Sequence, residues 1–205
     1  MSGILTPDKV VSVLESGEFE NFVNDYLGTV NAARLYADFS GWFTGLGYKE
    51  TEVFAYSLGK TVNMAHNLKD DYDICIGIAK GGLFSTYVFN KLGMDTKLAE
   101  AHAGPEKSTF EWIDSVSPDE LEGRRILVLE CDAISGGTSK KVLEVLSNYN
   151  PGEIDISFNV EPAGGKYGYG TNVSNIPDGY GKIHFPSSFS YENFGQAISA
   201  IRDAI

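Results

Sequence analysis

The sequence predicts an α/β fold in which a central, mainly parallel sheet is flanked by helices and carries a helical N-terminal cover. From about residue 71 onwards, short β-branched apolar runs alternate with amphipathic segments. This alternation is typical of βαβ units whose parallel strands are covered on both faces. Before that point, apolar residues recur at helical spacing and many are aromatic. We therefore expect a helical segment or hood, residues 1–70, packed on an α/β core, residues 71–205.

Helix signals delimit the N-terminal segment. Thr6 suits the N-cap and Pro7 the first helical position. Two further helical patterns end at Gly28 and Gly47, and glycine commonly terminates helices. A last helical pattern runs to about residue 68.

Strands and helices alternate through the rest of the chain. Apolar runs predict strands over 72–79 and 124–130, and alternation predicts a strand over 96–102. Two more strands are expected over 153–160 and, more weakly, over 181–185. Helices are predicted over 83–93, 139–149 and 190–205, and a capped turn over 117–123. We expect loops over 103–112 and over the glycine- and tyrosine-rich segment 162–181.

The charge of the chain excludes some partners. Its 28 acidic residues outnumber 16 basic ones, so the formal net charge is −12. Nonspecific nucleic-acid binding needs a basic face, and no nucleic-acid partner is expected. A small anionic ligand is compatible with this charge, because a few backbone N–H groups bind a phosphate locally.

Hydropathy and cysteine usage indicate the compartment. No apolar run approaches the ~18 residues that span a bilayer, and the first residues lack a signal-peptide pattern. Cys75 and Cys131 both lie in apolar runs, which favours free thiols over a disulfide. We expect a cytoplasmic protein with no membrane partner.

Two of the predicted strands end in glycine-rich turns that begin helices, "IAKGGL" and "AISGGTS". Ligands of parallel sheets bind beyond the carboxyl ends of the strands. In the second turn, glycines let the backbone N–H groups point inward, hydroxyls add donors, and the helix adds its positive N-terminal end. A phosphate site is therefore predicted at Ser135, Gly136, Gly137, Thr138 and Ser139.

Two acidic residues, Glu130 and Asp132, flank Cys131 where the strand 124–130 meets this turn. A carboxylate at the end of a buried strand is costly unless it meets a cation or hydroxyl groups. The two acids therefore indicate a sugar or a metal ion at this position. The alternative is that they only cap the following helix.

The stretch "ILVLECDAISGGTS" resembles the phosphoribosyl-pyrophosphate signature of the type I phosphoribosyltransferases: an apolar strand, two acidic positions, a short loop and Gly-Thr. Glu130 falls on the first acidic position and Cys131 on the second. The stretch "IGIAKGGL" resembles the pyrophosphate loop of that family, which implies pyrophosphate contacts at Ala79, Lys80, Gly81 and Gly82. The resemblance covers about residues 70–150 and implies a Rossmann-like phosphoribosyltransferase fold.

The resemblance also implies an activity. It implies a transferase, in particular a glycosyltransferase of nucleotide metabolism, that binds 5-phosphoribosyl 1-pyrophosphate or a nucleotide. Such an enzyme transfers the phosphoribosyl group to a base and releases pyrophosphate with the help of Mg²⁺. In this chain the resemblance places Glu130 and Asp132 at the ribose and the magnesium ion, and Lys107 and Ser108 in a mobile loop that closes over the site. Family members are commonly dimers, so a homodimer is expected.

Departures from the signature leave alternatives open. A thiol at Cys131 cannot hold a ribose diol as a carboxylate does, and Asp132 comes one place late, so that on a regular strand its side chain faces the other way. Ile134 stands where members acting on 6-oxopurines carry aspartate, which disfavours hypoxanthine and guanine and leaves the base unassigned. A magnesium-dependent transferase and a non-catalytic nucleotide-binding sensor or scaffold both remain hypotheses. A phosphate-ester hydrolase is a third, although the chain lacks an evident nucleophile–base pair for it.

Overall fold

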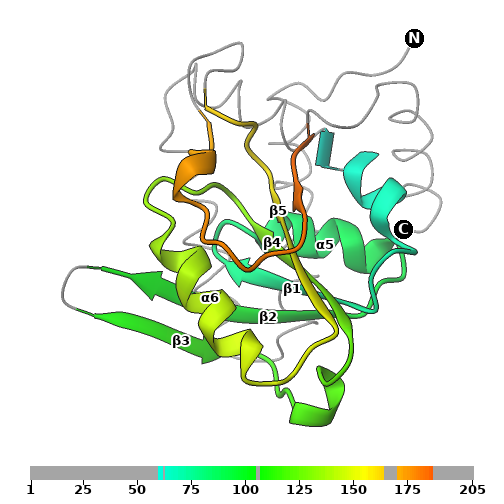
Figure 1. The fold of residues 1–205 in the computed structure, drawn as a ribbon. Coiled ribbons are helices and arrows are strands. Elements are labelled where there is room, and N and C mark those ends of the chain that lie inside the picture. Colours follow the sequence, from blue (N-terminus) through cyan, green and yellow to red (C-terminus); the bar gives the residue numbers. More distant parts are fainter. Residues whose placement is uncertain (1–59, 62, 105–106, 164–169, 187–205) are drawn as a thin grey trace, which may run out of the picture.

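The computed structural model of the chain describes residues 60–61, 63–104, 107–163 and 170–186. These residues form a six-stranded sheet in the order β3-β2-β1-β4-β5-β6. The strands are β1 Ile74–Ala79, β2 Thr96–Ala103, β3 Ser108–Trp112, β4 Arg125–Glu130, β5 Glu153–Phe158 and β6 Ile183–His184. All neighbouring pairs are parallel except β2 and β3. The predicted mainly parallel α/β sheet is therefore confirmed (Figure 1).

The central strands are buried on both faces. Every residue of β1 is buried, and β4 is buried from Ile126 to Glu130. Cys75 of β1 pairs with Thr96 of β2 on one side and with Leu127 of β4 on the other. Such strands read as continuous apolar runs in the sequence because helices cover both faces of the sheet.

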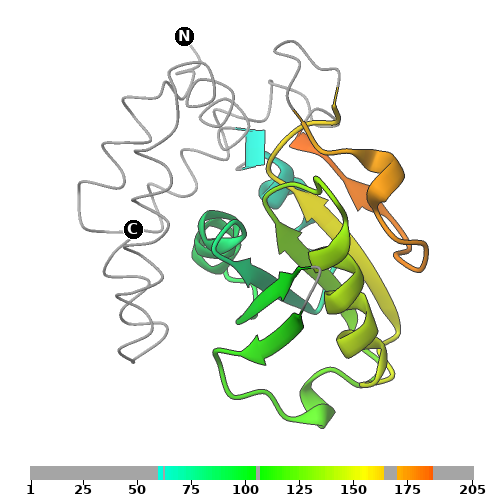
Figure 2. The same cartoon turned by 90° about the vertical axis from the view of Figure 1, so that its left-hand side faces the viewer.

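Two helices cover opposite faces of this sheet (Figure 2). Helix α5, Leu83–Lys91, connects β1 to β2, and helix α6, Gly137–Ser147, connects β4 to β5. Gly77 of β1 allows α5 to approach the sheet closely, because a Cβ at this position would lie 1.8 Å from Oγ1 of Thr86.

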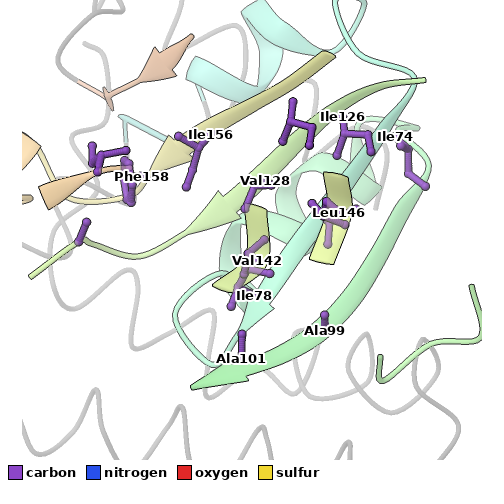
Figure 3. Close-up of a cluster of buried hydrophobic side chains, with 14 of the residues drawn as sticks. Ile74, Ile78, Ala99, Ala101, Ile126, Val128, Val142, Leu146, Ile156 and Phe158 are labelled. Atoms are coloured by element: carbon purple, nitrogen blue, oxygen red, sulfur yellow. The ribbon is translucent and has the colours of Figure 1, made fainter. Parts of the chain in front are cut away.

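A hydrophobic core lies between α6 and the sheet. Ile74, Ile76 and Ile78 alternate along β1, so their side chains share one face of the sheet. Val142 and Leu146 of α6 are fully buried in the same cluster. Figure 3 shows Val142 and Ile78 meeting between the helix and the strands. The strands and α6 therefore form one packed unit beneath the loops that follow β1 and β4.

The segment 103–112, which was expected to be a loop, contains strand β3. Ser108 pairs with Ala103, so it belongs to a β-hairpin with β2. The residues of β3 are half-buried or exposed, and no buried apolar run marks the strand in the sequence. Trp112 fastens this edge strand to the core by donating its indole N–H to the hydroxyl of Tyr149 at 3.0 Å.

The remaining elements largely follow the sequence patterns. The capped turn is a 3₁₀ helix, Pro118–Glu120, with a capping box between Ser117 and Glu120. The helical pattern that runs to about residue 68 is helical in the described residues 60–61 and 63–68. Most of the predicted N-terminal domain and the helix predicted over 190–205 lie outside the described residues. Within the part of the chain that the structure describes, no helix has the length and apolar character to cross a bilayer.

A buried polar cluster joins β5 to β6. Asp155 of β5 is fully buried and accepts hydrogen bonds from the Tyr72 hydroxyl at 2.5 Å and from the Lys182 backbone N–H at 2.6 Å. The same hydroxyl lies 2.7 Å from Nε2 of His184. Burial raises the pKa of Tyr72 and lowers the pKa of His184. The cluster thus holds a two-residue edge strand that ladder hydrogen bonds alone support weakly.

Candidate functional site

Strands β1 and β4 are neighbours at the centre of the sheet, and their onward connections run in opposite directions. From β1 the chain passes through α5 to β2 on one side, and from β4 it passes through α6 to β5 on the other. In open parallel sheets ligands bind at such a point, because the two loops diverge and leave a crevice beyond the carboxyl ends of the strands. Both glycine-rich turns lie here.

A cavity of about 310 Å³ occupies this position. Its walls come from the loops after β1 and β4 and from the end of β2, and the lining residues are Ala79, Lys80, Gly81, Ala101, His102, Glu130, Cys131, Asp132, Ile134 and Thr138. The cavity therefore brings together three residues predicted at the pyrophosphate (Ala79, Lys80 and Gly81), both acidic residues, and Thr138 of the predicted phosphate loop.

Glu130 ends β4 with a buried carboxyl group. Its Oε1 accepts the backbone N–H of Cys131 at 3.0 Å, whereas its Oε2 has no hydrogen-bond partner among the described residues. Burial, with the negative charge of Asp132 nearby, raises the pKa of Glu130 to about 8. A buried carboxyl oxygen without a partner is costly. This oxygen is therefore placed to bind a hydroxyl group or a cation of a ligand.

Asp132 lines the same cavity as Glu130 and Cys131, although on a regular strand its side chain would point to the opposite face from that of Cys131. The reason is that β4 ends at Glu130, so the alternation of side chains stops before Asp132 and no bulge is required. Burial raises the pKa of Asp132. Between the two acids, Cys131 is 6% exposed and burial raises the pKa of its thiol well above the usual range. Cys131 is therefore a neutral thiol that contributes to the cavity wall.

The loop over residues 135–139 presents unpaired N–H groups at the start of α6. The Gly137 N–H approaches Oγ of Ser135 at 3.5 Å. The N–H groups of Ser135, Gly136, Thr138 and Ser139 donate no hydrogen bond to the described residues. Free N–H groups at a helix N-terminus, aligned with the helix dipole, form an anion site. The loop can therefore receive a phosphate.

The segment 172–175 packs against this loop. Asn172 donates its backbone N–H to the carbonyl of Ala133 at 2.9 Å, and the Asn175 side chain donates to the carbonyl of Ile134 at 2.5 Å. Gly136 has a left-handed φ of 72°, and a Cβ there would lie 1.7 Å from the Asn175 carbonyl oxygen. Both observations require glycine at this position. Part of the glycine- and tyrosine-rich segment therefore holds the predicted phosphate loop in shape.

The loop after β1 divides into cavity residues and a packing residue. Ala79, Lys80 and Gly81 line the cavity, and the Ala79–Lys80 peptide bond is cis. Gly82 is buried and lies outside the cavity, since a Cβ there would meet the Leu129 carbonyl oxygen at 2.1 Å. Gly82 thus permits the close packing of this loop on β4.

Other residues predicted for the site also lie outside the cavity: Lys107, Ser108, Ser135, Gly136, Gly137 and Ser139. Ser108 and Gly137 line an adjacent hollow of about 360 Å³ together with Lys140 and Lys141. Ser139 is 2% exposed, and its carbonyl accepts the Tyr180 hydroxyl at 2.8 Å. Its side chain therefore belongs to the packing of α6.

His102 is a cavity residue that the sequence alone left unassigned. It lies near the end of β2, where its Nε2 is 3.1 Å from Oε1 of Glu100 on the same face of the strand. Its position near the carboxyl end of a predicted strand is the sequence signal that could have assigned His102 to the site. Ile134, at the cavity edge, is 75% exposed. The cavity therefore has an apolar side chain at its edge and ionisable side chains, such as those of Glu130 and Asp132, in its wall.

Comparison with known proteins finds similarity to phosphoribosyltransferases. No family model matches the chain. Over 98 residues the chain is 26% identical to an orotate phosphoribosyltransferase of Sulfurisphaera tokodaii, and the match covers 47% of each protein. The chain thus spans about half the length of this curated relative. The relative confirms the resemblance to phosphoribosyltransferases that the two motifs indicate.

Solved structures show similarities at lower identity. The chain is similar to a purine phosphoribosyltransferase from Pyrococcus horikoshii, with 21% identity, a TM-score of 0.43, and coverage of 50% of this chain and 71% of that chain. It is also similar to a hypothetical protein from Neisseria gonorrhoeae with bound ppGpp, with 14% identity, a TM-score of 0.46, and coverage of 73% of this chain and 93% of that chain.

Proposed function

We propose that this chain is a phosphoribosyltransferase that binds 5-phosphoribosyl 1-pyrophosphate and transfers its phosphoribosyl group to a base. The observation that carries the proposal is the pairing of two unsatisfied features beside one cavity. Among the described residues, the N–H groups of Ser135, Gly136, Thr138 and Ser139 have no acceptor, and Oε2 of Glu130 has no partner. An anion would satisfy the N–H groups, and a hydroxyl group or a cation would satisfy Oε2 of Glu130. A sugar phosphate bound with a metal ion supplies the anion, the hydroxyl groups and the cation.

The proposed roles follow the order of the elements around the cavity. The loop over residues 135–139 binds the 5′-phosphate through its N–H groups. Glu130 and Asp132 bind the ribose hydroxyls and orient the sugar, which is a positioning contribution to catalysis. Lys80, whose side chain is exposed at the loop after β1, offers a positive charge to the pyrophosphate. Lys107 and Ser108 lie at the β2–β3 hairpin, and we propose that they approach the pyrophosphate only when ligand is bound.

The proposed reaction exchanges one bond at the ribose anomeric carbon. The bond from this carbon to a pyrophosphate oxygen breaks, and pyrophosphate leaves with the electron pair. A bond to a nitrogen of the base forms, and that nitrogen gives up its proton to solvent. The sugar becomes positively charged on the way, and carboxylates fixed beside it stabilise that charge.

The acidic residues at the cavity fit a magnesium ion that is shared with the ligand. Carboxylate oxygens suit Mg²⁺, which is usually held by one or two carboxylates together with substrate phosphates. Glu130 and Asp132 supply carboxylates, and a cation next to them would oppose the rise in their pKa values. When bound, Mg²⁺ neutralises pyrophosphate charge and eases its departure.

A non-catalytic binding protein with the same ligand is the second hypothesis, and the thiol of Cys131 favours it. Cys131 occupies a position where the resembled family carries a second acid, and it is buried and neutral here. Asp132 supplies a second carboxyl group at the same cavity, which favours transfer. Release of pyrophosphate from 5-phosphoribosyl 1-pyrophosphate across a panel of nucleobases, orotate included, separates the two hypotheses. Binding without release for every base identifies a sensor or scaffold.

Calorimetry with 5-phosphoribosyl 1-pyrophosphate and MgCl₂ tests the binding that both hypotheses share. Thr138→Asp places a negative charge on the cavity wall at the start of α6, where the helix dipole favours a carboxylate in the unliganded protein. We expect this variant to remain folded and to bind at least about tenfold more weakly, because two anions compete for one site. Ser115→Asp, at an exposed position before the 3₁₀ helix, adds the same charge as a control. Wild-type protein that binds no ligand would remove the proposed function.

Three further expectations remain proposals of the same kind. We propose that the helical segment 1–70 is the hood that contacts the base, that the protein is a homodimer, and that it acts in the cytoplasm on small-molecule ligands. Sedimentation of the purified chain with and without ligand tests the second.

A further inference from the structure

A single buried amide joins the two loops of the cavity. Asn159 follows β5 and is 1% exposed, and it makes hydrogen bonds through both its backbone and its side chain. It does not line the cavity. Fully buried polar side chains are retained where their hydrogen bonds are satisfied, and the partners of this one lie on elements that the site depends on.

The backbone of Asn159 is attached to the acidic end of β4. Its N–H donates to the carbonyls of Glu130 at 3.1 Å and Cys131 at 2.9 Å, and the next N–H, of Val160, donates to the Cys131 carbonyl at 3.0 Å. These bonds extend the β4–β5 pairing beyond the last ladder pair, Glu130 with Phe158. The backbone of Asn159 is therefore fixed to the backbone of Glu130 and Cys131.

The side chain of Asn159 is attached to the glycine loop after β1. Its Nδ2 donates to the Gly81 carbonyl at 3.2 Å. Its Oδ1 accepts hydrogen bonds from the hydroxyls of Ser85 on α5 and of Thr61. Because hydroxyl donors hold the oxygen, the amide is oriented with its N–H₂ group towards Gly81.

The position of Gly81 bears directly on the acidic wall. A Cβ at Gly81 would lie 2.3 Å from Cβ of Cys131 and 3.2 Å from Oε1 of Glu130. Gly81 therefore lies close against Cys131 and near the Glu130 carboxyl group, and a small shift of its loop changes the space between the loop and the end of β4. A hydrogen bond that fixes the Gly81 carbonyl therefore fixes the distance across the cavity between the loop after β1 and the end of β4.

We propose that Asn159 is the positioning residue that sets the distance between the pyrophosphate loop and the acidic end of β4, and so prepares the cavity for a diphosphate-bearing ligand. The role rests on the proposed function. Preorganised loops bind more tightly because less conformational freedom is lost on binding. Loss of the Asn159–Gly81 bond therefore weakens ligand binding without removing any group that contacts the ligand.

Asn159→Asp tests this role, and Ser85→Ala is its matched control. The introduced carboxyl group keeps the size of the amide and the acceptor for Ser85, but when ionised it has no proton to donate to Gly81. We expect binding of 5-phosphoribosyl 1-pyrophosphate with magnesium to be about tenfold or more weaker than wild type at pH 8. The ratio of wild-type to variant affinity should fall at pH 5.5, where the protonated carboxyl group can donate again. Ser85→Ala removes one of the two hydroxyl donors to Oδ1 of the same amide and leaves the bond to Gly81 in place, so it should weaken binding less than either Asn159 variant does.

A second variant, Asn159→Ala, and amide hydrogen exchange complete the test. Asn159→Ala should bind weakly at both pH values, because it has no proton to restore, and it replaces Asn159→Asp if that variant does not fold. In ligand-free protein, exchange at residues 80–82 should be faster in both Asn159 variants than in Ser85→Ala. Equal affinity in wild type and both Asn159 variants, or equal weakening in Ser85→Ala, would overturn the role. Wild-type protein that does not bind would overturn the proposed function, and unchanged exchange at residues 80–82 would separately overturn the contact.

Discussion

The carbonyl oxygen of Asn175 lies where a side chain on Gly136 would begin: a Cβ at Gly136 would be 1.7 Å from it. The two residues are 39 positions apart in the sequence (175 − 136), and Asn175 also donates to the carbonyl of Ile134. The loop predicted to bind phosphate is therefore held by a segment that follows β5, and not by local turn geometry alone.

Gly136→Ala should damage this loop more than a left-handed backbone alone explains. Gly93 also has a left-handed φ, 86°, but has open space around it. Gly93→Ala therefore measures the cost of the left-handed backbone alone, about 1–2 kcal/mol of unfolding free energy. Gly136→Ala adds displacement of Asn175 and should lower both stability and ligand affinity further. Urea unfolding and calorimetry measure the two effects. Equal losses of unfolding free energy in Gly136→Ala and Gly93→Ala would mean that Asn175 moves aside at no cost.

Glu130→Gln should change how stability depends on pH. The pKa of Glu130 is raised from 4.5 to about 8, so between these values the folded state binds more protons than the unfolded state. The unfolding free energy of ligand-free wild type therefore falls as pH rises through this range, by up to about 1.4 kcal/mol per pH unit for one proton. Glu130→Gln removes this contribution, whereas Glu111→Gln on the exposed edge strand should not.

Urea unfolding at pH 5, 6.5 and 8 measures that difference. We expect Glu130→Gln to gain stability relative to wild type on going from pH 5 to pH 8. Magnesium with 5-phosphoribosyl 1-pyrophosphate should reduce the gain, since the ligand stabilises the charged carboxylate. A constant difference between wild type and variant at all three pH values would contradict the raised pKa.

Cys131→Asp should destabilise the ligand-free protein and respond strongly to ligand. The new carboxyl group would be buried between Glu130 and Asp132, at a position that is 6% exposed, and we expect a loss of about 2–3 kcal/mol compared with Cys131→Ser. A magnesium ion and ribose hydroxyls would satisfy the carboxyl group, so the gap should narrow when ligand is present. Thermal unfolding of both variants with and without ligand measures this, and a gap that ligand leaves unchanged would place the side chain away from the bound sugar.

Tyr72→Phe should lower stability and leave ligand binding intact. The change removes the hydroxyl that donates to the fully buried Asp155 at 2.5 Å, which costs about 1–3 kcal/mol because a buried acceptor loses a partner. Tyr149→Phe, which loses a half-buried bond with Trp112, is the matched control and should cost less. Reduced affinity in Tyr72→Phe would show that the polar cluster is coupled to the cavity.

The elements that sequence patterns predicted well are the buried ones. Strands β1 and β4 read as apolar runs because both faces of the sheet are covered, and α6 follows a glycine turn at the predicted place. Strand β3 could not be predicted in this way, because its residues are half-buried or exposed and its pairing with β2 is a tertiary contact.

The candidate site was predictable where it is continuous in sequence. The two glycine loops and Glu130 carry local signals, and the cavity unites members of both. The Asp132 side chain was expected to face the other way from the position of Cys131, but it lines the cavity. The expectation failed because the residue at which β4 ends depends on hydrogen bonding with β5, which the apolar run does not reveal. Asn159 and Asn175 have distant partners, and in the sequence each is one polar residue among many. Asn159 only continues the alternation of Asp155 and Ser157 past the end of β5, so no local signal identified it.

The two thiols of this chain are sheltered to different depths. Cys75 lies in β1 between two strands and is fully buried, so a modifying reagent reaches it only when the sheet itself opens. Cys131 borders the cavity, so separation of the Gly81 loop from β4 is enough to expose it. Alkylation kinetics of the wild-type protein should therefore distinguish global unfolding, which exposes Cys75, from local opening of the cavity, which exposes Cys131. Bound ligand would slow alkylation of Cys131 by keeping the cavity closed, and would slow alkylation of Cys75 by stabilising the folded state.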